Sequence, residues 1–227
     1  PVLLGVIVGA IASGAVGNAQ SKLAMGNAQA MLATANAQQA LDSVRPSFAE
    51  IFVTPWLDFF PLAVGLLALA LFAFLAAVYL TVAARDEALR EDFRTRALAA
   101  AGAAFITAAA ALLVAHVHAP TVGRGLVETM PALLLQGATA IAALTAIFAL
   151  WTRRWQLARI AAAAQVSLVL WGWVLVQYPF IVPPIATLRN AAAPPVTLEL
   201  LLSALALGAI VLLPSLWYLL RTFTDDA

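Results

Sequence analysis

The sequence predicts an all-α protein, a polytopic bundle of about six transmembrane helices with its C-terminus in the cytoplasm. The first observation is composition: of 227 residues, 64% are hydrophobic and only 10% are charged, and the mean hydropathy is +0.97. A water-soluble domain of this size cannot hide that much apolar surface, so lipid must be its solvent. The second is that charges cluster, leaving uncharged runs that reach the roughly 20 residues needed to cross about 30 Å of hydrocarbon. The third is the distribution of arginine and lysine, which sets the orientation.

We expect one transmembrane domain over residues 1–227. Its first helix covers 1–17, and an outer insertion rich in Ala, Gln and Asn covers 18–55. Five further membrane helices are predicted over 57–84, 96–118, 128–152, 157–178 and 197–221. No stretch alternates apolar and polar residues with a period of two, so membrane-spanning strands are not expected.

Basic residues alternate between rich and poor loops along the chain. The rich set is Arg85, Arg90, Arg94, Arg96, Arg153, Arg154, Arg159 and Arg221. The poor set is Lys22, Arg45, Arg124 and Arg189. Because basic residues favour cytoplasmic loops, the rich set and the C-terminus are predicted to be cytoplasmic.

The first helix carries small residues at intervals of four, at Gly5, Gly9, Ser13 and Gly17. They predict a flat stripe against which another helix can pack closely; the alternative is the lining of a small-molecule path. Next, Asn-Ala-Gln recurs at 18, 27 and 36. Nine residues advance a helix by about two and a half turns, so successive copies would face opposite sides. We interpret this repeat as a low-complexity outer insertion.

The stretch "RDEALREDFRTRA", residues 85–97, mixes arginines with carboxylates. Asp86–Arg90 and Asp92–Arg96 have the four-residue spacing of ion pairs on an exposed helical turn. A solvated cytoplasmic segment explains the pattern, and binding of anionic lipid headgroups is the alternative.

Few side chains suit catalysis or ligation. The chain has no cysteine, which excludes disulfides and thiolate sites. His116 and His118 are two apart on a helix, so they point about 200° apart and cannot share one metal. Both lie at the outer edge of a membrane segment. The methionines also lie at such an edge or outside the membrane. We therefore expect no catalytic residue, metal site or cofactor on this chain, and the net charge of +1 gives no reason to expect nucleic acid.

Three carboxylates stand at the predicted outer starts of inward-running helices: Asp58, Glu128 and Glu199. A carboxylate stabilises a helix N-terminus by roughly 0.3–1 kcal/mol, which accounts for all three. The alternative is a role in proton movement, for which carboxylates deeper in the membrane are expected.

Aromatic residues gather near the predicted membrane boundaries, as in an aromatic belt. Trp171 and Trp173 lie slightly deeper, and with Tyr178 they are candidates for packing on a lipid or a quinone. Beyond them, residues 178–195 hold five prolines among apolar residues. Proline stiffens a chain and removes N–H groups that would lack partners in a dry place, so we expect a rigid outer cap; the alternative is a loose loop.

Several stretches resemble subunit II of the cytochrome bd-type quinol oxidases (cytochrome d ubiquinol oxidase subunit II). They are "GWVLVQYPFIVPPIATLRNAAAPPVTLELLL" with "LLPSLWYLLRTF" near the C-terminus, "GVIVGAIASG" at 5–14, and "PLAVGLLALALFAFLAAVYLTVAA" with "LREDFRTRALAAA" at 61–101. The resemblance covers almost the whole chain except 18–50. Family members have about eight helices, and this chain matches the later ones. Since it begins at Pro1, we expect an upstream part to be missing.

The resemblance implies a haem-free transmembrane subunit of a bacterial inner-membrane oxidase that passes electrons from quinol to oxygen. Its partner, subunit I, would carry haem b and haem d, and this chain would support its assembly and stability without catalytic residues. Membrane lipid and a bound quinone are further candidate partners. The helix count alone equally allows a transporter half or a membrane scaffold unrelated to respiration.

Overall fold

The computed structural model describes residues 1–32 and 47–224. Its elements are α1 (Val2–Ala12), α2 (Ala15–Leu32), α4 (Phe48–Phe52), α5 (Thr54–Leu57), α6 (Phe59–Ala83), α7 (Glu87–His118), α8 (Pro120–Glu128), α9 (Met130–Trp151), α10 (Trp155–Gln177), β1 (Phe180–Val182), β2 (Ala186–Thr187) and α11 (Pro195–Thr224). Five described helices are long and apolar enough to span a membrane, or six if α1 and α2 form one bent span. The predicted helical membrane fold is confirmed. The third Asn-Ala-Gln copy and Arg45 lie outside the described residues.

The chain forms two compact units, residues 1–187 and 188–227. The second unit consists of a short lead-in and α11, which starts where the Thr197 and Leu198 N–H groups donate to the Pro194 carbonyl at 2.9 and 3.2 Å. Proline suits a first helical turn because it has no N–H to satisfy there.

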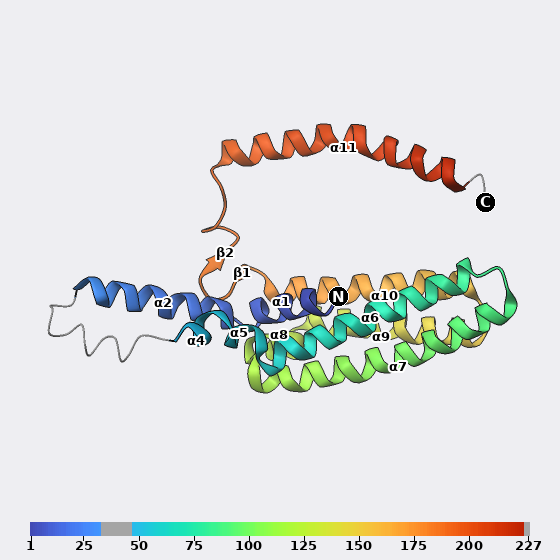
Figure 1. Ribbon diagram of the computed structural model, residues 1–227, viewed down its shortest axis with the longest axis horizontal. Helices are drawn as coiled ribbons and strands as arrows, with labels where there is room; N and C mark the ends of the chain where they lie inside the picture. Colours follow the sequence, from blue (N-terminus) through green and yellow to red (C-terminus); the bar gives the residue numbers. More distant parts are fainter. Residues whose placement is uncertain (33–46, 225–227) are drawn as a thin grey trace. The chain divides into compact units, whose positions relative to one another are not determined.

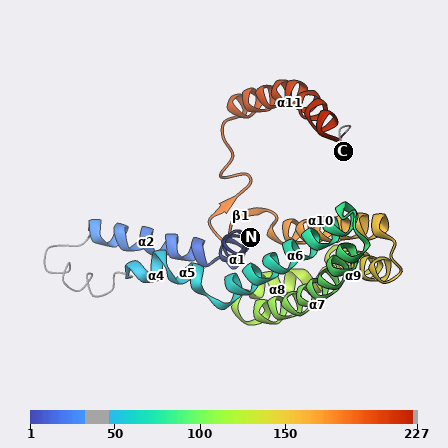
Figure 2. The same ribbon diagram turned by 45° about the vertical axis from the view of Figure 1, so that its right-hand side comes forward.

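Four helices of the first unit, α6, α7, α9 and α10, lie side by side (Figures 1 and 2). The face that α7 buries is made of alanines at Ala97, Ala104, Ala111 and Ala115. Their spacing of seven and four keeps one stripe in register along a neighbouring helix, and the small side chains allow close approach. The largest buried cluster joins all four helices: Phe74, Ala77, Val78, Ala97, Ala146, Ala149, Leu150, Ala158, Ala161 and Ala162.

The bundle has two ends of different composition. The α6–α7 and α9–α10 turns meet at one end, which we call the basic end because Arg90, Arg94, Arg153 and Arg154 lie there. The start of α6 meets the end of α7 at the other, where Asp58 contacts His118. The prolines of the β1–β2 hairpin follow α10 at that end, so we call it the proline end.

The first predicted helix, residues 1–17, is broken in the structure. α1 ends at Ala12 and α2 continues from Ala15 at an angle of 58°. Ser13 caps the end of α1 with its N–H on the Gly9 carbonyl, and Gly14 has φ of +77°, a left-handed conformation that glycine adopts without steric cost. The small residues predicted to form one stripe therefore lie on both sides of a helix break and face two different neighbours.

Gly5 and Gly9 of α1 face α6. A Cβ on Gly5 would lie 2.7 Å from the Gly65 Cα, and one on Gly9 would lie 2.7 Å from the Pro61 Cα. Both distances are too short for a real side chain, so the predicted close helix contact is confirmed for these two glycines. Gly17, beyond the bend, instead faces the Pro183 carbonyl of the hairpin, where a Cβ would clash.

The ends of α6, α9 and α10 lie within two residues of the predicted ones, and α11 ends at Thr224, three residues beyond 221. The largest difference is at α7, which starts at Glu87 and not at 96. Asp86 is the N-cap of α7, and its Oδ1 accepts from the Ala88 N–H at 3.4 Å. The negative charge of Glu87 in the first turn stabilises the positive end of the helix dipole. The helix therefore includes most of the charged stretch that was expected to be a solvated turn.

The proline connector, residues 178–187, forms a small hairpin. β1 and β2 pair antiparallel, with Phe180 opposite Thr187 and Val182 opposite Ala186. The connector is tied to α10 by Gln177, a largely buried residue whose Nε2 donates to the Ile181 carbonyl at 3.4 Å. This part of the predicted rigid cap packs on the α1–α2 bend through Pro183. Residues 188–195 of that prediction belong to the second unit.

Candidate functional site

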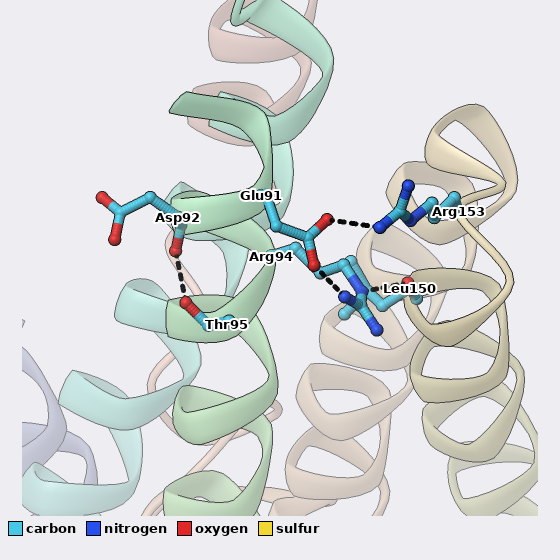
Figure 3. A network of polar contacts seen from close by, with 6 residues as sticks. All are labelled: Glu91, Asp92, Arg94, Thr95, Leu150 and Arg153. Carbon is cyan, nitrogen blue, oxygen red and sulfur yellow. Dashed lines mark hydrogen bonds and ion pairs between the residues drawn. The ribbon is translucent and has the colours of Figure 1, made fainter. Parts of the chain in front are cut away.

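Polar side chains of the first unit gather at its two ends, and the larger network lies at the basic end (Figure 3). Arg94 points from α7 toward the end of α9, and its Nε donates to the Leu150 carbonyl at 2.9 Å. Glu91, one turn earlier on α7, pairs with Arg94 through Oε1 and with Arg153 through Oε2, the latter at 3.4 Å. One carboxylate thus joins an arginine of α7 to an arginine of the α9–α10 turn.

The end of α9 explains why this network forms there. The Arg154 N–H donates to the Ala149 carbonyl at 2.8 Å, and the Arg153 N–H donates to the Leu150 carbonyl at 3.4 Å. These two hydrogen bonds form the Schellman motif, in which the residue just after the helix has a left-handed conformation. Arg153 takes that conformation with φ of 58°, although glycine is the usual residue. An arginine at this position gains an ion pair with the Glu91 carboxylate, which glycine could not form.

The exposed charges of α7 pair only partly as the spacing predicted. Arg96 contacts Asp92 at 2.8 Å, which confirms that pair. The predicted Asp86–Arg90 pair is wrong, because Asp86 turns to cap the helix. Arg90 instead lies 3.9 Å from Glu87 and donates from Nη2 to the Ala84 carbonyl at 2.7 Å, so it satisfies the end of α6.

At the proline end, Asp58 is placed by the start of α6. Asp58 is the N-cap of α6, and its Oδ1 accepts from the N–H of the first helical residue, Phe59, at 2.7 Å. The same oxygen lies 3.3 Å from Nδ1 of His118, whose ring is 5.3 Å from the Phe59 ring. Asp58 therefore joins the first turn of α6 to the last turn of α7.

The other candidate carboxylates are not placed at helix starts. Glu128 is the last residue of α8, and the residue at the start of α9 is Thr129, which makes no side-chain cap there. Glu199 is the fifth residue of α11, beyond its first turn. Among the described residues, Asp58 forms its hydrogen bond and ion pair with Phe59 and His118 and not with Glu128. Glu199 belongs to the second unit.

Among the aromatic candidates, Trp173 packs inward and the other two face outward. Trp173 lies against the cluster of Ala12, Phe60, Ala115, Ala119 and Val122 at the proline end, and its Nε1 is buried without a hydrogen-bond partner in the described residues. Trp171 and Tyr178 are 63% and 69% exposed. Any ligand packing on these aromatics would meet Trp171 or Tyr178 on the outside of the first unit.

The two histidines occupy the last turn of α7, at the end of its span. His116 Nδ1 lies 3.1 Å from the Leu112 carbonyl of its own helix, while His118 turns to Asp58. The described part of the chain contains no group of three or more His, Cys, Asp or Glu residues placed to hold a metal ion.

The Glu91–Arg94–Arg153 network was not predicted as a site. Spacing along α7 gives the Glu91–Arg94 pair, three residues apart. The link to Arg153 depends on the packing of α9 on α7, which spacing cannot give. A weak signal was available: two adjacent arginines follow a tryptophan and threonine at a helix end where glycine would be usual.

A similar architecture is found in a solved protein structure. No curated protein sequence matches the chain. A chain of the solved "structure of bd oxidase from Geobacillus thermodenitrificans" is similar in fold, with a TM-score of 0.63 and 21% sequence identity. The match covers 80% of this chain and 54% of that one, so this chain spans about half the length of its solved relative.

The family evidence comes from sequence. The profile described as "Cytochrome bd terminal oxidase subunit II" matches residues 1–223, nearly the full length. With the helical membrane fold and the similar solved chain, the resemblance seen in the sequence is confirmed. The chain is a multi-pass membrane protein that belongs to the cytochrome bd terminal oxidase subunit II family.

Proposed function

We propose that this chain is the haem-free transmembrane subunit of a bacterial quinol:oxygen oxidoreductase, and that it stabilises a haem-bearing partner, subunit I, in the inner membrane. The observation that carries the proposal is the family match over residues 1–223. Haem b and haem d would lie in the partner, together with the reaction of quinol with oxygen. This chain would contribute helices, surface and assembly.

The placement of the histidines supports a haem-free role. Haem iron is held in proteins by His, Cys, Met or Tyr side chains. The two imidazoles lie at the end of the α7 span, and His118 is engaged by Asp58 at 3.3 Å. We propose that neither imidazole holds a haem iron, and we assign no electron-transfer step to them.

The apolar outer surface of the first unit supports a partner role. In each of its four membrane helices, α6, α7, α9 and α10, at most 33% of the most apolar 18-residue window is buried within the chain. Side chains such as Phe105, Ile141 and Leu144 are more than 60% exposed. Lipid covers such a surface, and so does a second helical subunit, which is how we propose that part of it is used.

Asp58 is best explained as a structural residue. It caps α6 and holds His118, and both of their side chains are about one-third exposed, at 33% and 34%. We propose that this pair fastens α6 to α7 at the proline end. A proton-related role for Asp58, Glu128 or Glu199 remains a separate hypothesis, since these carboxylates come from different elements and two different units.

The test uses the double variant His116→Ala with His118→Ala in the co-expressed complex. If neither imidazole holds haem, the reduced-minus-oxidised spectrum should keep every haem band at the same amplitude per complex. A matched variant, His118→Asn, keeps a polar group near Asp58 and controls for a loss of folding. Selective loss of one haem band from a fully assembled double variant would overturn the proposal.

A further inference from the structure

A cavity of about 480 Å³ opens at the basic end, where α6 ends and α7 and α10 begin. It is a shallow depression that is open to its surroundings on one side. The lining residues are Val82, Arg90, Arg154, Trp155, Gln156 and Leu157. Two of the six are arginines and none is acidic, so the cavity has a positive lining.

Arg90 is held in place as one wall of this cavity. Its Nη2 donates to the Ala84 carbonyl at 2.7 Å, and its guanidinium carbon lies 5.9 Å from the centre of the Trp155 ring. The nearest carboxylate oxygen, on Glu87, is 3.9 Å away, and the Glu87 side chain is 74% exposed. This contact is long and solvated, so it leaves most of the positive charge of Arg90 uncompensated.

Arg154 supplies the second charge from the N-cap position of α10. Its side chain makes no cap hydrogen bond, and the first turn of α10 contains no acidic residue. Within the described residues, no carboxylate lies at ion-pair distance from the Arg154 guanidinium. The first backbone bond of α10 is from the Ala158 N–H to the Arg154 carbonyl, at 3.0 Å. The preceding N–H groups, on the lining residues 155–157, thus lack partners within the helix and add to the positive end.

Apart from Gln156, the remaining lining is apolar and lies at the boundary of the membrane span. Val82 is in the last turn of α6, and Leu157, in the first turn of α10, is 38% exposed. Tryptophan at a helix end is typical of the membrane interface. A ligand with a charged head and an apolar tail would meet the arginines and the apolar walls together.

We propose that this cavity binds a phosphate-bearing anion, supplied by the headgroup of an anionic phospholipid. Arg90 and Arg154 would form charge-assisted hydrogen bonds to phosphate oxygens, which arginine favours through its planar, fork-shaped guanidinium. Inorganic phosphate shares the same chemistry and is the other source. The site does not depend on the proposed respiratory function, because it is built from residues of this chain alone.

The test is a ligand titration of the membrane complex purified in detergent. Bound ligand is measured by native mass spectrometry with short-chain phosphatidylglycerol, with phosphatidylcholine of the same chain length, and with inorganic phosphate. Phosphatidylglycerol should bind more tightly than phosphatidylcholine. Arg154→Gln should weaken phosphatidylglycerol binding roughly tenfold, the effect of losing one charge-assisted contact.

Two further variants separate binding from folding. Gln156→Glu puts a carboxylate at the start of α10, where it favours the helix but repels an anion, so it should keep the fold and weaken binding. Arg96→Gln is the matched control, because Arg96 is an arginine of α7 with a 65% exposed side chain that pairs with Asp92 outside the cavity; it should leave binding unchanged.

The outcomes are distinct. Binding of inorganic phosphate alone, sensitive to both Arg154→Gln and Gln156→Glu, would support the site and identify free phosphate as its source. Phosphatidylglycerol binding with the same sensitivity, not displaced by phosphate, would support the lipid headgroup. The proposal is overturned if neither variant weakens binding of either ligand, or if Arg96→Gln weakens it equally.

Discussion

Arg94 of α7 donates a hydrogen bond from Nε to the Leu150 carbonyl in the last turn of α9, at 2.9 Å. Leu150 is fully buried, and its carbonyl also accepts from the Arg153 N–H at 3.4 Å. Arg94 therefore gives this buried carbonyl at the helix end a second, charged and shorter hydrogen bond. Because Glu91 holds both Arg94 and Arg153, the contact fastens α9 to α7 at the basic end.

Replacing Arg94 should therefore destabilise the bundle. Arg94→Met keeps the apolar stem but removes the hydrogen bond to Leu150, and hydrogen bonds to charged groups contribute roughly 1.5–3 kcal/mol. We expect the free energy of unfolding, measured by denaturant titration in detergent micelles, to fall by about this amount. Arg96→Met, which removes an exposed pair only, should cost less than about 1 kcal/mol. Equal losses for both variants would contradict the network.

Arg153 should respond differently to glycine and to alanine. A left-handed residue with a Cβ costs roughly 1–2 kcal/mol, and the exposed pair with Glu91 returns about 0.2–1 kcal/mol. Arg153→Gly removes both terms and should be neutral or slightly stabilising. Arg153→Ala removes the pair but keeps the Cβ, so it should be the less stable variant. The comparison is made by thermal unfolding of the two purified variants, and an alanine variant at least as stable as glycine would refute it.

The α1–α6 contact should reject even one methyl group. A Cβ on Gly5 would lie 2.7 Å from the Gly65 Cα and the Val64 carbonyl oxygen. Gly5→Ala must therefore push backbone apart, and overpacking of this kind costs roughly 1–3 kcal/mol. Gly137→Ala on α9 has open space around the new Cβ and should lose nothing, because alanine favours a helix. Unfolding midpoints of the two variants measure the difference, and similar midpoints would rule out the close contact.

The membrane fold and the family followed from sequence because composition, run length and the proline-rich stretch are local patterns. The break at residues 13–14 was missed because small residues at intervals of four suggest an unbroken stripe. Ser13 and Gly14 show why it is broken: a helix cap and a left-handed glycine act together. Spacing alone does not reveal that combination.

The sites were harder to predict than the spans. Asp58 was correctly placed at a helix start, because the apolar run begins immediately after it. Glu128 was misplaced because a short amphipathic helix, α8, precedes Thr129 and ends with this residue. The Arg94–Leu150 bond joins residues 56 positions apart, and only tertiary packing brings such residues together.

Asp58 should tolerate asparagine but not alanine. Asparagine is as good an N-cap as aspartate, whereas alanine leaves the Phe59 N–H without its 2.7 Å acceptor and costs roughly 0.5–2 kcal/mol. We expect Asp58→Ala to lower the free energy of unfolding by about 1 kcal/mol and Asp58→Asn to change it less. Oxidase turnover per assembled complex should be the same in both, since the proposed role is structural. A sharp loss of turnover in both variants, with normal assembly, would favour the proton-related role.

The proline connector should matter for assembly. Phe180 and Ile181 are 36% and 46% exposed on the first unit, and covering such side chains contributes roughly 1.5–3 kcal/mol each when burial is complete. Replacing both by serine should lower the yield of the assembled oxidase, with little change in quinol oxidation per intact complex. Met130→Ser, an exposed apolar residue at the start of α9, is the matched control. Normal assembly with a sharp fall in turnover would instead place the connector in a functional site.

The most direct test of the haem-free partner role is a visible absorption spectrum of this chain purified by its own affinity tag, with and without co-expression of a haem-bearing subunit I. We expect no haem bands from the chain alone. With the partner, haem bands should appear in a complex that contains both subunits. Haem bands from the chain alone, or failure of subunit I to co-purify with it, would contradict the proposed haem-free partner role.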